Sequence, residues 1–109
     1  MKRKHLYVIG PVTGKPDRNR AAFEEARGKL EAAGYKVTIP HDFIPEDALW
    51  GMAMRASLAR ILKRKLFGVA TLAGWRESEG ARLEEKVARA TDVLVMPVDI
   101  WASMKGDRE

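Results

Sequence analysis

The fold is decided by the stretch Leu-Tyr-Val-Ile-Gly-Pro at residues 6–11, an apolar run that stops at a glycine and a proline. A short, β-rich run closed by such residues predicts a buried strand. A loop rich in Gly, Pro and Thr follows over residues 10–17. From about residue 18 to residue 33 the apolar positions fall at helical spacing, and Gly34 predicts the helix end.

The rest of the chain repeats this alternation. The further predicted strands are residues 35–39, 67–73 and 92–98. The further predicted helices are residues 47–66 and 81–91, and the apolar stripe of the first of these is Trp50, Met54, Leu58, Ile61 and Leu62. The pattern predicts one α/β domain over residues 1–109. We expect a small doubly wound, flavodoxin- or Rossmann-like parallel sheet of about four strands in the order 2-1-3-4, with helices on both faces.

Composition limits the classes of function. The sequence has no Cys and two His, which excludes a disulfide framework and argues against a zinc site. We expect neither a metal nor a cofactor. The apolar run at residues 6–9 is too short for a signal peptide or a membrane span, so we expect a cytoplasmic protein without a membrane partner. The net charge of +5 fits either a solvated basic surface or an anionic partner.

Two loops meet at the predicted switch point of the sheet. In the order 2-1-3-4 this point lies between the first and third strands, and ligands bind there beyond the carboxyl ends of the strands. The loops are residues 10–17 and 74–79. In the first, Gly10 and Gly14 allow close approach of the backbone, Thr13 offers a hydroxyl, and the helix that follows favours an anion. Alone, this segment is equally typical of an ordinary strand-to-helix turn.

The second loop leads into a helix with an inward carboxylate. Ser78 is predicted as the N-cap, and Gly80 opens the helix. Glu84 shares a face with small or apolar residues, namely Ala81, Val87 and Ala88. A carboxylate that points at the sheet is costly unless it is hydrogen-bonded or used. Tyr7, on the first strand, is a natural partner, so Glu84 is either a structural partner of Tyr7 or a functional group.

Three segments carry a resemblance that covers most of the chain. They are Tyr-Val-Ile-Gly-Pro-Val-Thr-Gly-Lys-Pro-Asp-Arg-Asn-Arg (7–20), Val-Thr-Ile-Pro-His (37–41) and Gly-Trp-Arg-Glu-Ser-Glu-Gly-Ala-Arg-Leu-Glu (74–84). With their spacing, they resemble the nucleoside 2-deoxyribosyltransferase-like superfamily. Within it, the chain is most similar to a branch of short phage and bacterial domains of unassigned function.

The resemblance implies a site for glycosyl transfer. The glutamate that matches Glu84 is the family's nucleophile, which attacks the anomeric carbon of a 2-deoxyribosyl group and expels the base. The covalent glycosyl-enzyme is then resolved by water or by another base. The tyrosine that matches Tyr7 positions this carboxylate. The first segment surrounds the 5′ end of the sugar, and its candidate substrate-binding residues are Gly10, Thr13, Gly14 and Asn19.

Two further positions bear on the substrate. Ser78 matches the serine that the family's nucleotide N-hydrolases place near the 5′-phosphate, whereas transferases of free nucleosides carry an Asp there. A neutral donor suits a dianion because like charges repel. We therefore expect a nucleoside 5′-monophosphate rather than a nucleoside, with Ser78 near its phosphate and Gly80 as a further candidate substrate-binding residue. His41 matches a pocket position beside the base, although a loop histidine in solvent would have the same pattern.

One departure from the family pattern leaves two functions open. The family carries an Asp in a Met-Arg-x-Asp context, and this chain has Ser57 instead. Ser57 faces inward but cannot act as a carboxylic acid, and either Asp42 or Glu46 could replace that acid. One hypothesis is N-glycosidic bond cleavage or base exchange on a (deoxy)nucleoside 5′-monophosphate. The alternative is a non-catalytic module that binds or sequesters a nucleotide.

Two features of the sequence bear on macromolecular partners. A basic face formed by Arg55, Arg60, Lys63, Arg64 and Lys65 would suit DNA, but no aromatic residues interleave with it, so we do not expect nucleic acid as a partner. Near the C-terminus, Ile100 and Trp101 are expected either to cover a sheet edge or to meet a second subunit. Because relatives assemble as dimers or larger, we expect a homodimer or a larger homo-oligomer.

Overall fold

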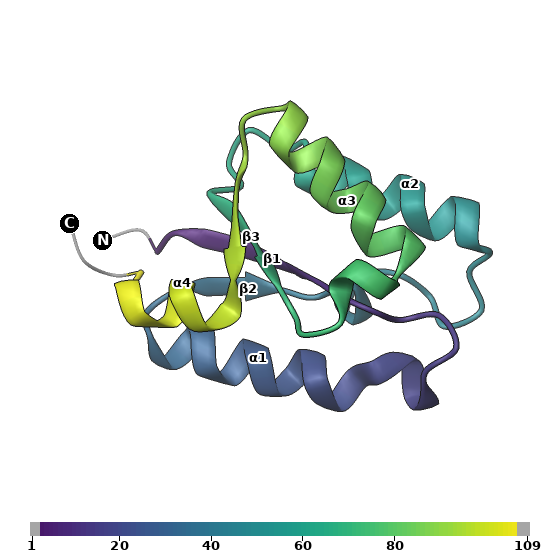
Figure 1. Ribbon diagram of the computed structural model, residues 1–109, viewed down its shortest axis with the longest axis horizontal. Helices are drawn as coiled ribbons and strands as arrows, with labels where there is room; N and C mark the ends of the chain where they lie inside the picture. Colours follow the sequence, from purple (N-terminus) through teal and green to yellow (C-terminus); the bar gives the residue numbers. More distant parts are fainter. Residues whose placement is uncertain (1–2, 107–109) are drawn as a thin grey trace.

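A four-stranded parallel sheet lies between two helical layers in the computed structural model, which describes residues 3–106 (Figure 1). The strands lie in the order β2-β1-β3-β4, with bounds β1 His5–Ile9, β2 Lys36–Thr38, β3 Gly68–Thr71 and β4 Leu94–Pro97. The helices are α1 Arg20–Ala32, α2 Trp50–Ile61, α3 Glu79–Ala90 and α4 Val98–Met104. The predicted α/β fold and strand order are confirmed.

The side chains of the central strand β1 alternate between two apolar cores. Leu6 and Val8 belong to the core on the side of α1 and α4, whereas Tyr7 and Ile9 belong to the core that includes residues of α2 and α3. Side chains alternate along a strand, and a parallel sheet with helices on both faces buries both sets. The same alternation places the Tyr7 ring in the layer of α2 and α3.

The first helix, predicted from about residue 18, starts slightly later. Asp17, Arg18 and Asn19 have positive φ angles of 47°, 53° and 60°, so α1 begins only at Arg20. Residues other than glycine rarely adopt this left-handed backbone conformation because their Cβ crowds the following carbonyl. The chain therefore makes a tight left-handed turn between β1 and α1, and long-range contacts described below hold it.

Several other predicted elements are longer than the observed ones. The helix predicted over residues 47–66 is α2, and the two ends of its predicted stripe, Trp50 and Leu62, are exposed because the helix starts at one and ends before the other. The predicted loop at residues 74–79 contains a 3-10 turn, Trp75–Glu77. The strand predicted as buried over residues 92–98 is β4, whose Leu94 is exposed because β4 forms a sheet edge.

Trp101 lies in the core and not on a subunit surface. Its side chain is 1% exposed, its indole Nε1 donates to the Val69 carbonyl at 2.9 Å, and the Tyr35 hydroxyl donates to its own carbonyl at 2.6 Å. A Cβ at Gly68 would collide with the indole ring, so this glycine makes room for it. Of the two alternatives for Trp101, covering a sheet edge or meeting a second subunit, the second is wrong. None of the helices within residues 3–106 is long and apolar enough to cross a bilayer.

Removing the Trp101 side chain tests this packing. We expect Trp101→Ala to lower the free energy of unfolding by about 3–5 kcal/mol, because it leaves a large cavity. Ile100→Ala, at a neighbouring side chain that is 47% exposed, should change it by less than about 0.5 kcal/mol. Urea denaturation of both variants measures the difference, and similar small losses in both would contradict the assignment of Trp101 to the core.

Candidate functional site

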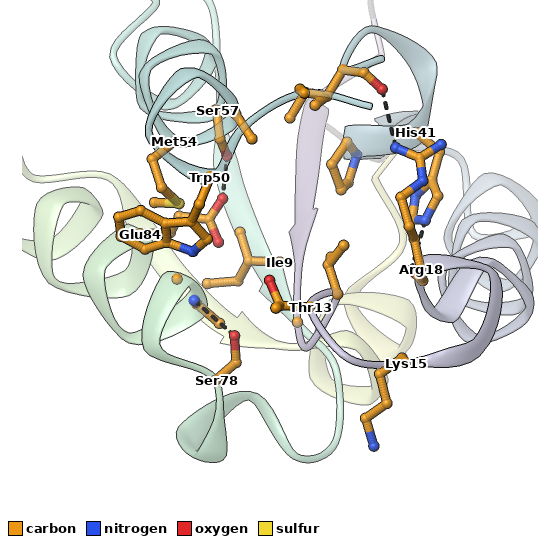
Figure 2. A pocket seen from close by; sticks show the side chains of 18 of the residues that line it. Ile9, Thr13, Lys15, Arg18, His41, Trp50, Met54, Ser57, Ser78 and Glu84 are labelled. Atoms are coloured by element: carbon orange, nitrogen blue, oxygen red, sulfur yellow. Dashed lines mark hydrogen bonds between the residues drawn. The ribbon is translucent and has the colours of Figure 1, made fainter. Parts of the chain in front are cut away.

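A cavity of about 320 Å³ opens beyond the carboxyl end of β1, at the predicted switch point of the sheet (Figure 2). Its walls come from the first loop, from the segment between β2 and α2, from α2 and from the start of α3. The volume lies at the lower end of the range for small-molecule pockets. The topology therefore places a ligand-sized cavity where open α/β sheets bind ligands.

The inner wall of the cavity carries a chain of three hydroxyl and carboxyl groups. The Ser57 hydroxyl donates to Oε2 of Glu84, and the Tyr7 hydroxyl lies 2.8 Å from Oγ of Ser57. Because the single proton of Ser57 goes to Glu84, Tyr7 must donate to Ser57. The inward orientation predicted for Glu84 is confirmed, since its side chain is 8% exposed. The direct bond predicted from Tyr7 is wrong, because Ser57 of α2 lies between the two groups.

Burial sets the proton affinities in this chain. Burial raises the pKa of Glu84 to about 7, and the hydrogen bond from Ser57 only partly offsets it. Burial, together with the charge of Glu84, raises the pKa of Tyr7 above its usual value, so Tyr7 stays a donor. Oε1 of Glu84 accepts no hydrogen bond from any residue in the range 3–106, and Glu84 lines the cavity. One carboxylate oxygen is thus held and the other is free.

The start of α3 adds hydrogen-bond donors on the same side. Oγ of Ser78 accepts from the Ala81 amide at 3.2 Å, so the predicted N-cap is confirmed, although the helix begins at Glu79. The Ser78 hydroxyl proton remains available to a ligand. Ser78 and Gly80 both line the cavity. A helix N-terminus with a free hydroxyl favours an anionic group.

The first loop reaches the cavity with most of its predicted residues. Gly10, Thr13 and Gly14 line it, and so does Lys15, which the sequence did not single out. Gly14 has a φ of 80°. A Cβ at Gly10 would collide with Leu72, so this glycine permits close packing between the ends of β1 and β3.

Asn19 lies apart from the main cavity. Its Nδ2 donates to the Pro11 carbonyl at 3.0 Å, which ties the end of the left-handed turn to the first loop. It lines a second, adjoining hollow between the first loop and the start of α3. The contact with Pro11 gives Asn19 a role in shaping the loop, and its predicted role in substrate binding stays a prediction.

The wall opposite Glu84 contains His41 and Arg18 (Figure 2). The His41 ring is half-buried, lies 4.8 Å from the Phe23 ring between centroids, and donates from Nε2 to the Arg18 carbonyl at 2.9 Å. His41 is therefore not a loop side chain in solvent. Sequence reasoning missed Arg18, although the run Asp-Arg-Asn after Pro16 contains residue types that tolerate left-handed backbone.

Asp42 and Glu46, the two candidates to replace the Asp of the resembled superfamily, lie at different positions relative to the cavity. Asp42 accepts from the Arg27 side chain at 2.6 Å and from the Ile39 amide at 3.0 Å, and it does not line the cavity. Glu46 lines the cavity.

Trp50, another residue that the sequence did not assign to the site, lines both the cavity and the adjoining hollow and is 46% exposed beside Glu84 (Figure 2). No group of three His, Cys, Asp or Glu between residues 3 and 106 is arranged to hold a metal ion.

A family model described as a domain of unknown function, DUF4406, matches residues 4–97. The chain belongs to the DUF4406 family. The match spans all four strands and every group of the hydroxyl–carboxyl chain in this DUF4406 domain. The family carries no assigned activity, so the resemblance to nucleoside 2-deoxyribosyltransferases is a basis for a proposal only. A comparison with curated proteins finds no match.

The raised pKa of Glu84 makes the stability of this DUF4406 domain depend on pH. The native state holds the Glu84 proton more tightly than the unfolded chain, whose usual value is 4.5. The Glu84 contribution to stability is therefore fully present below about pH 4.5 and is lost as the pH rises to about 7, by about 3 kcal/mol in total. Glu84→Gln removes this loss, so we expect the variant to gain stability over wild type across that window.

Denaturant unfolding at several pH values between 4 and 8 measures the gain. Glu85→Gln is the matched control, because Glu85 is the next residue of α3 and pairs instead with Arg89. The Glu85 variant should show no growth of the difference between pH 4.5 and 7. A difference between Glu84→Gln and wild type that stays constant across the range would contradict the assignment.

Proposed function

We propose that this DUF4406 domain cleaves or exchanges the N-glycosidic bond of a (deoxy)nucleoside 5′-monophosphate, with Glu84 as the nucleophile. The observation that carries the proposal is a buried carboxylate with one oxygen held by Ser57 and the other free toward a ligand-sized cavity. A positioned carboxylate with one oxygen free is the arrangement that covalent glycosyl transfer needs. The resemblance of residues 7–20, 37–41 and 74–84 to the deoxyribosyltransferase-like superfamily supports the same chemistry.

The reaction proceeds in two displacements. Oε1 of Glu84 attacks the anomeric carbon, and the bond from that carbon to the base breaks. The base leaves with the electron pair and takes up a proton. Water then attacks the same carbon, the ester bond to Glu84 breaks, and the proton of the water is released. A second base in place of water gives base exchange. Only the ionised carboxylate attacks, and a pKa near 7 leaves a substantial share of Glu84 ionised at neutral pH.

The phosphate is proposed to lie at the start of α3. Ser78 keeps its hydroxyl proton free while its oxygen caps the helix, and Gly80 leaves the first turn of the helix without a side chain there. Lys15, from the first loop, lines the same cavity and brings a positive charge. These groups suit a dianion, whereas a carboxylate at position 78 would repel it.

A non-catalytic module that binds a nucleotide is the second candidate. Ser57, in place of a carboxylic acid, favours it, because a hydroxyl cannot protonate the leaving base. Glu46 is the acid of the cavity that could do so, and it is exposed. Calorimetry that detects nucleotide binding without any base release would favour this candidate, and the absence of binding would contradict both.

The predicted homo-oligomer stays a prediction. Trp101 does not support it, because it is buried within its own chain. Leu49 and Met52, at the start of α2, are exposed apolar side chains that self-association would cover.

Base release tests the proposed activity. The protein is incubated with a panel of deoxynucleoside and nucleoside 5′-monophosphates and with the free nucleosides, and the bases are separated by chromatography. We expect release from a monophosphate, and a loss of about 10⁴-fold or more in Glu84→Ala because the nucleophile is gone. Glu85→Ala on the same helix is the control and should keep the activity. Release that persists in Glu84→Ala would refute the proposed nucleophile.

The hydroxyl of Ser57 is proposed to position Glu84, and a pH profile tests this. The hydrogen bond from Ser57 lowers the pKa of Glu84, so Ser57→Ala should move the acidic limb of the kcat profile to higher pH. Ser57→Thr keeps a hydroxyl and should restore the limb toward its original position. A limb that does not move in Ser57→Ala would mean that Ser57 only fills space beside the carboxylate.

A further inference from the structure

The turn before α1 holds Arg18 at the cavity by contacts with distant segments. Three successive residues, Asp17, Arg18 and Asn19, have left-handed backbone without being glycine. Arg18 donates from Nη1 to the Ile44 carbonyl at 3.1 Å, and its own carbonyl accepts from Nε2 of His41 at 2.9 Å. Backbone strain of this kind persists only where surrounding structure imposes it, and it gathers at functional positions. Its consequence here is a fixed guanidinium on the cavity wall opposite Glu84 (Figure 2).

The Arg18 guanidinium leaves one of its edges unused. Nη1 is bound to Ile44, whereas Nε is buried and makes no hydrogen bond. Nη2 also donates to no group in the described part of the chain, and Arg18 takes part in no ion pair there. The Nε and Nη2 protons point in nearly the same direction, which is how arginine donates to two adjacent acceptors of one planar group. A buried donor without an acceptor is costly, so a ligand with two adjacent acceptors would satisfy this edge.

His41 offers an acceptor on the same wall. A carbonyl oxygen only accepts, so Nε2 of His41 carries the proton that it gives to Arg18. Burial lowers the pKa of His41, as do the charges of Arg18 and Arg20, so the ring is neutral and Nδ1 has a free lone pair. Nδ1 is buried and has no partner within residues 3–106. Arg18 and His41 both line the cavity, so this wall contains two unpaired donors and one unpaired acceptor.

The surroundings of this wall favour a flat base over a phosphate. Phe23, Pro40, Ile44 and Pro45 line the cavity with the two polar residues, and they offer a dianion no further donors. The start of α3 with Ser78 is the part of the cavity with free donors for a phosphate. A base in contact with Arg18 and a phosphate at Ser78 would then place the sugar between them, near Glu84.

We propose that Arg18, with His41 beside it, selects a 6-oxopurine nucleotide, with guanine or hypoxanthine as the base. A 6-oxopurine presents N7 and O6 as adjacent acceptors and the N1 proton next to them, which complements the two donors of Arg18 and the acceptor of His41. Adenine places an amino donor where O6 would be, facing the donors of Arg18. The assignment deepens the proposed function and rests on it for the nucleotide character of the ligand.

Calorimetry with matched nucleotides tests the selection. The probes are the 5′-monophosphates of deoxyguanosine, deoxyinosine and deoxyadenosine, and 2-deoxyribose 5-phosphate, which lacks a base. We expect wild type to bind the two 6-oxopurine nucleotides about 10-fold or more tightly than the adenine nucleotide. Arg18→Lys keeps the charge and a donor for Ile44 but loses the two-donor edge, so the ratio should fall close to one. Arg55→Ala, on the exposed face of α2, is the control and should keep the ratio.

Three outcomes would overturn the proposal. Equal or tighter binding of the adenine nucleotide by wild type, or an unchanged ratio in Arg18→Lys, overturns the proposal. Weaker binding of 2-deoxyribose 5-phosphate in Arg18→Lys, to the same degree as the nucleotide, places the phosphate at Arg18 and also overturns it. If Arg18→Lys does not fold, His41→Phe replaces it. This variant keeps the ring contact with Phe23, and we expect it to weaken 6-oxopurine binding and leave adenine binding unchanged.

The base-release assay separates this proposal from the proposed function. A 6-oxopurine preference in binding without release of any base supports the selection and contradicts the enzymatic proposal. Release of bases with no such preference does the reverse. A failure to bind any nucleotide overturns both.

Discussion

The hydrogen bond from Ser57 to the buried Glu84 carboxylate is the interaction on which the rest of the site depends. It joins α2 to α3, and through the Tyr7 hydroxyl it reaches the central strand β1. Only one oxygen of the carboxylate is compensated in this way, so burial still raises the pKa of Glu84 to about 7. The fold thus retains a carboxylate that would be more favourable in water. Such a residue is unfavourable for stability and useful for chemistry, because it is held in one orientation and is poorly solvated.

The sheet order brings groups of opposite character to the two sides of one cavity. Glu84, Ser57 and Ser78 come from the layer of α2 and α3, whereas Arg18 and His41 come from the segments that follow β1 and β2. These segments meet because parallel strands end at the same edge of the sheet and the order reverses at β1. The carboxylate and the guanidinium are therefore held apart and do not neutralise each other. Each remains available to a different part of a bound molecule.

Ser57 both completes and limits the site. As a donor it fixes Oε2 of Glu84, which a carboxylate at the same position could do only while protonated. As a hydroxyl it supplies no acid for a leaving base, and Asp42 is held away from the cavity by Arg27. Ser57 thus holds the proposed nucleophile but cannot act as a proton source. A catalytic site and a nucleotide-binding site are both consistent with Ser57, and they differ in whether a proton donor such as Glu46 reaches the leaving base.

The sequence by itself determined the features that depend on local pattern. Apolar periodicity and Gly or Pro breakers predict the strands, helices and strand order; helical spacing predicts that Glu84 faces inward, and Ser78 has the residue type of an N-cap. The tertiary structure alone decided the features that need residues far apart. Ser57 lies 27 positions from Glu84 and 50 from Tyr7, and Trp101 reaches Val69 across 32 positions. Arg18 adopts its left-handed backbone because Ile44 and His41 hold it there. Asp17 and Asn19 are residue types that tolerate that conformation, but Arg18 is not, so the local pattern is only a weak signal. Only the assembled fold places the Arg18 side chain in the cavity.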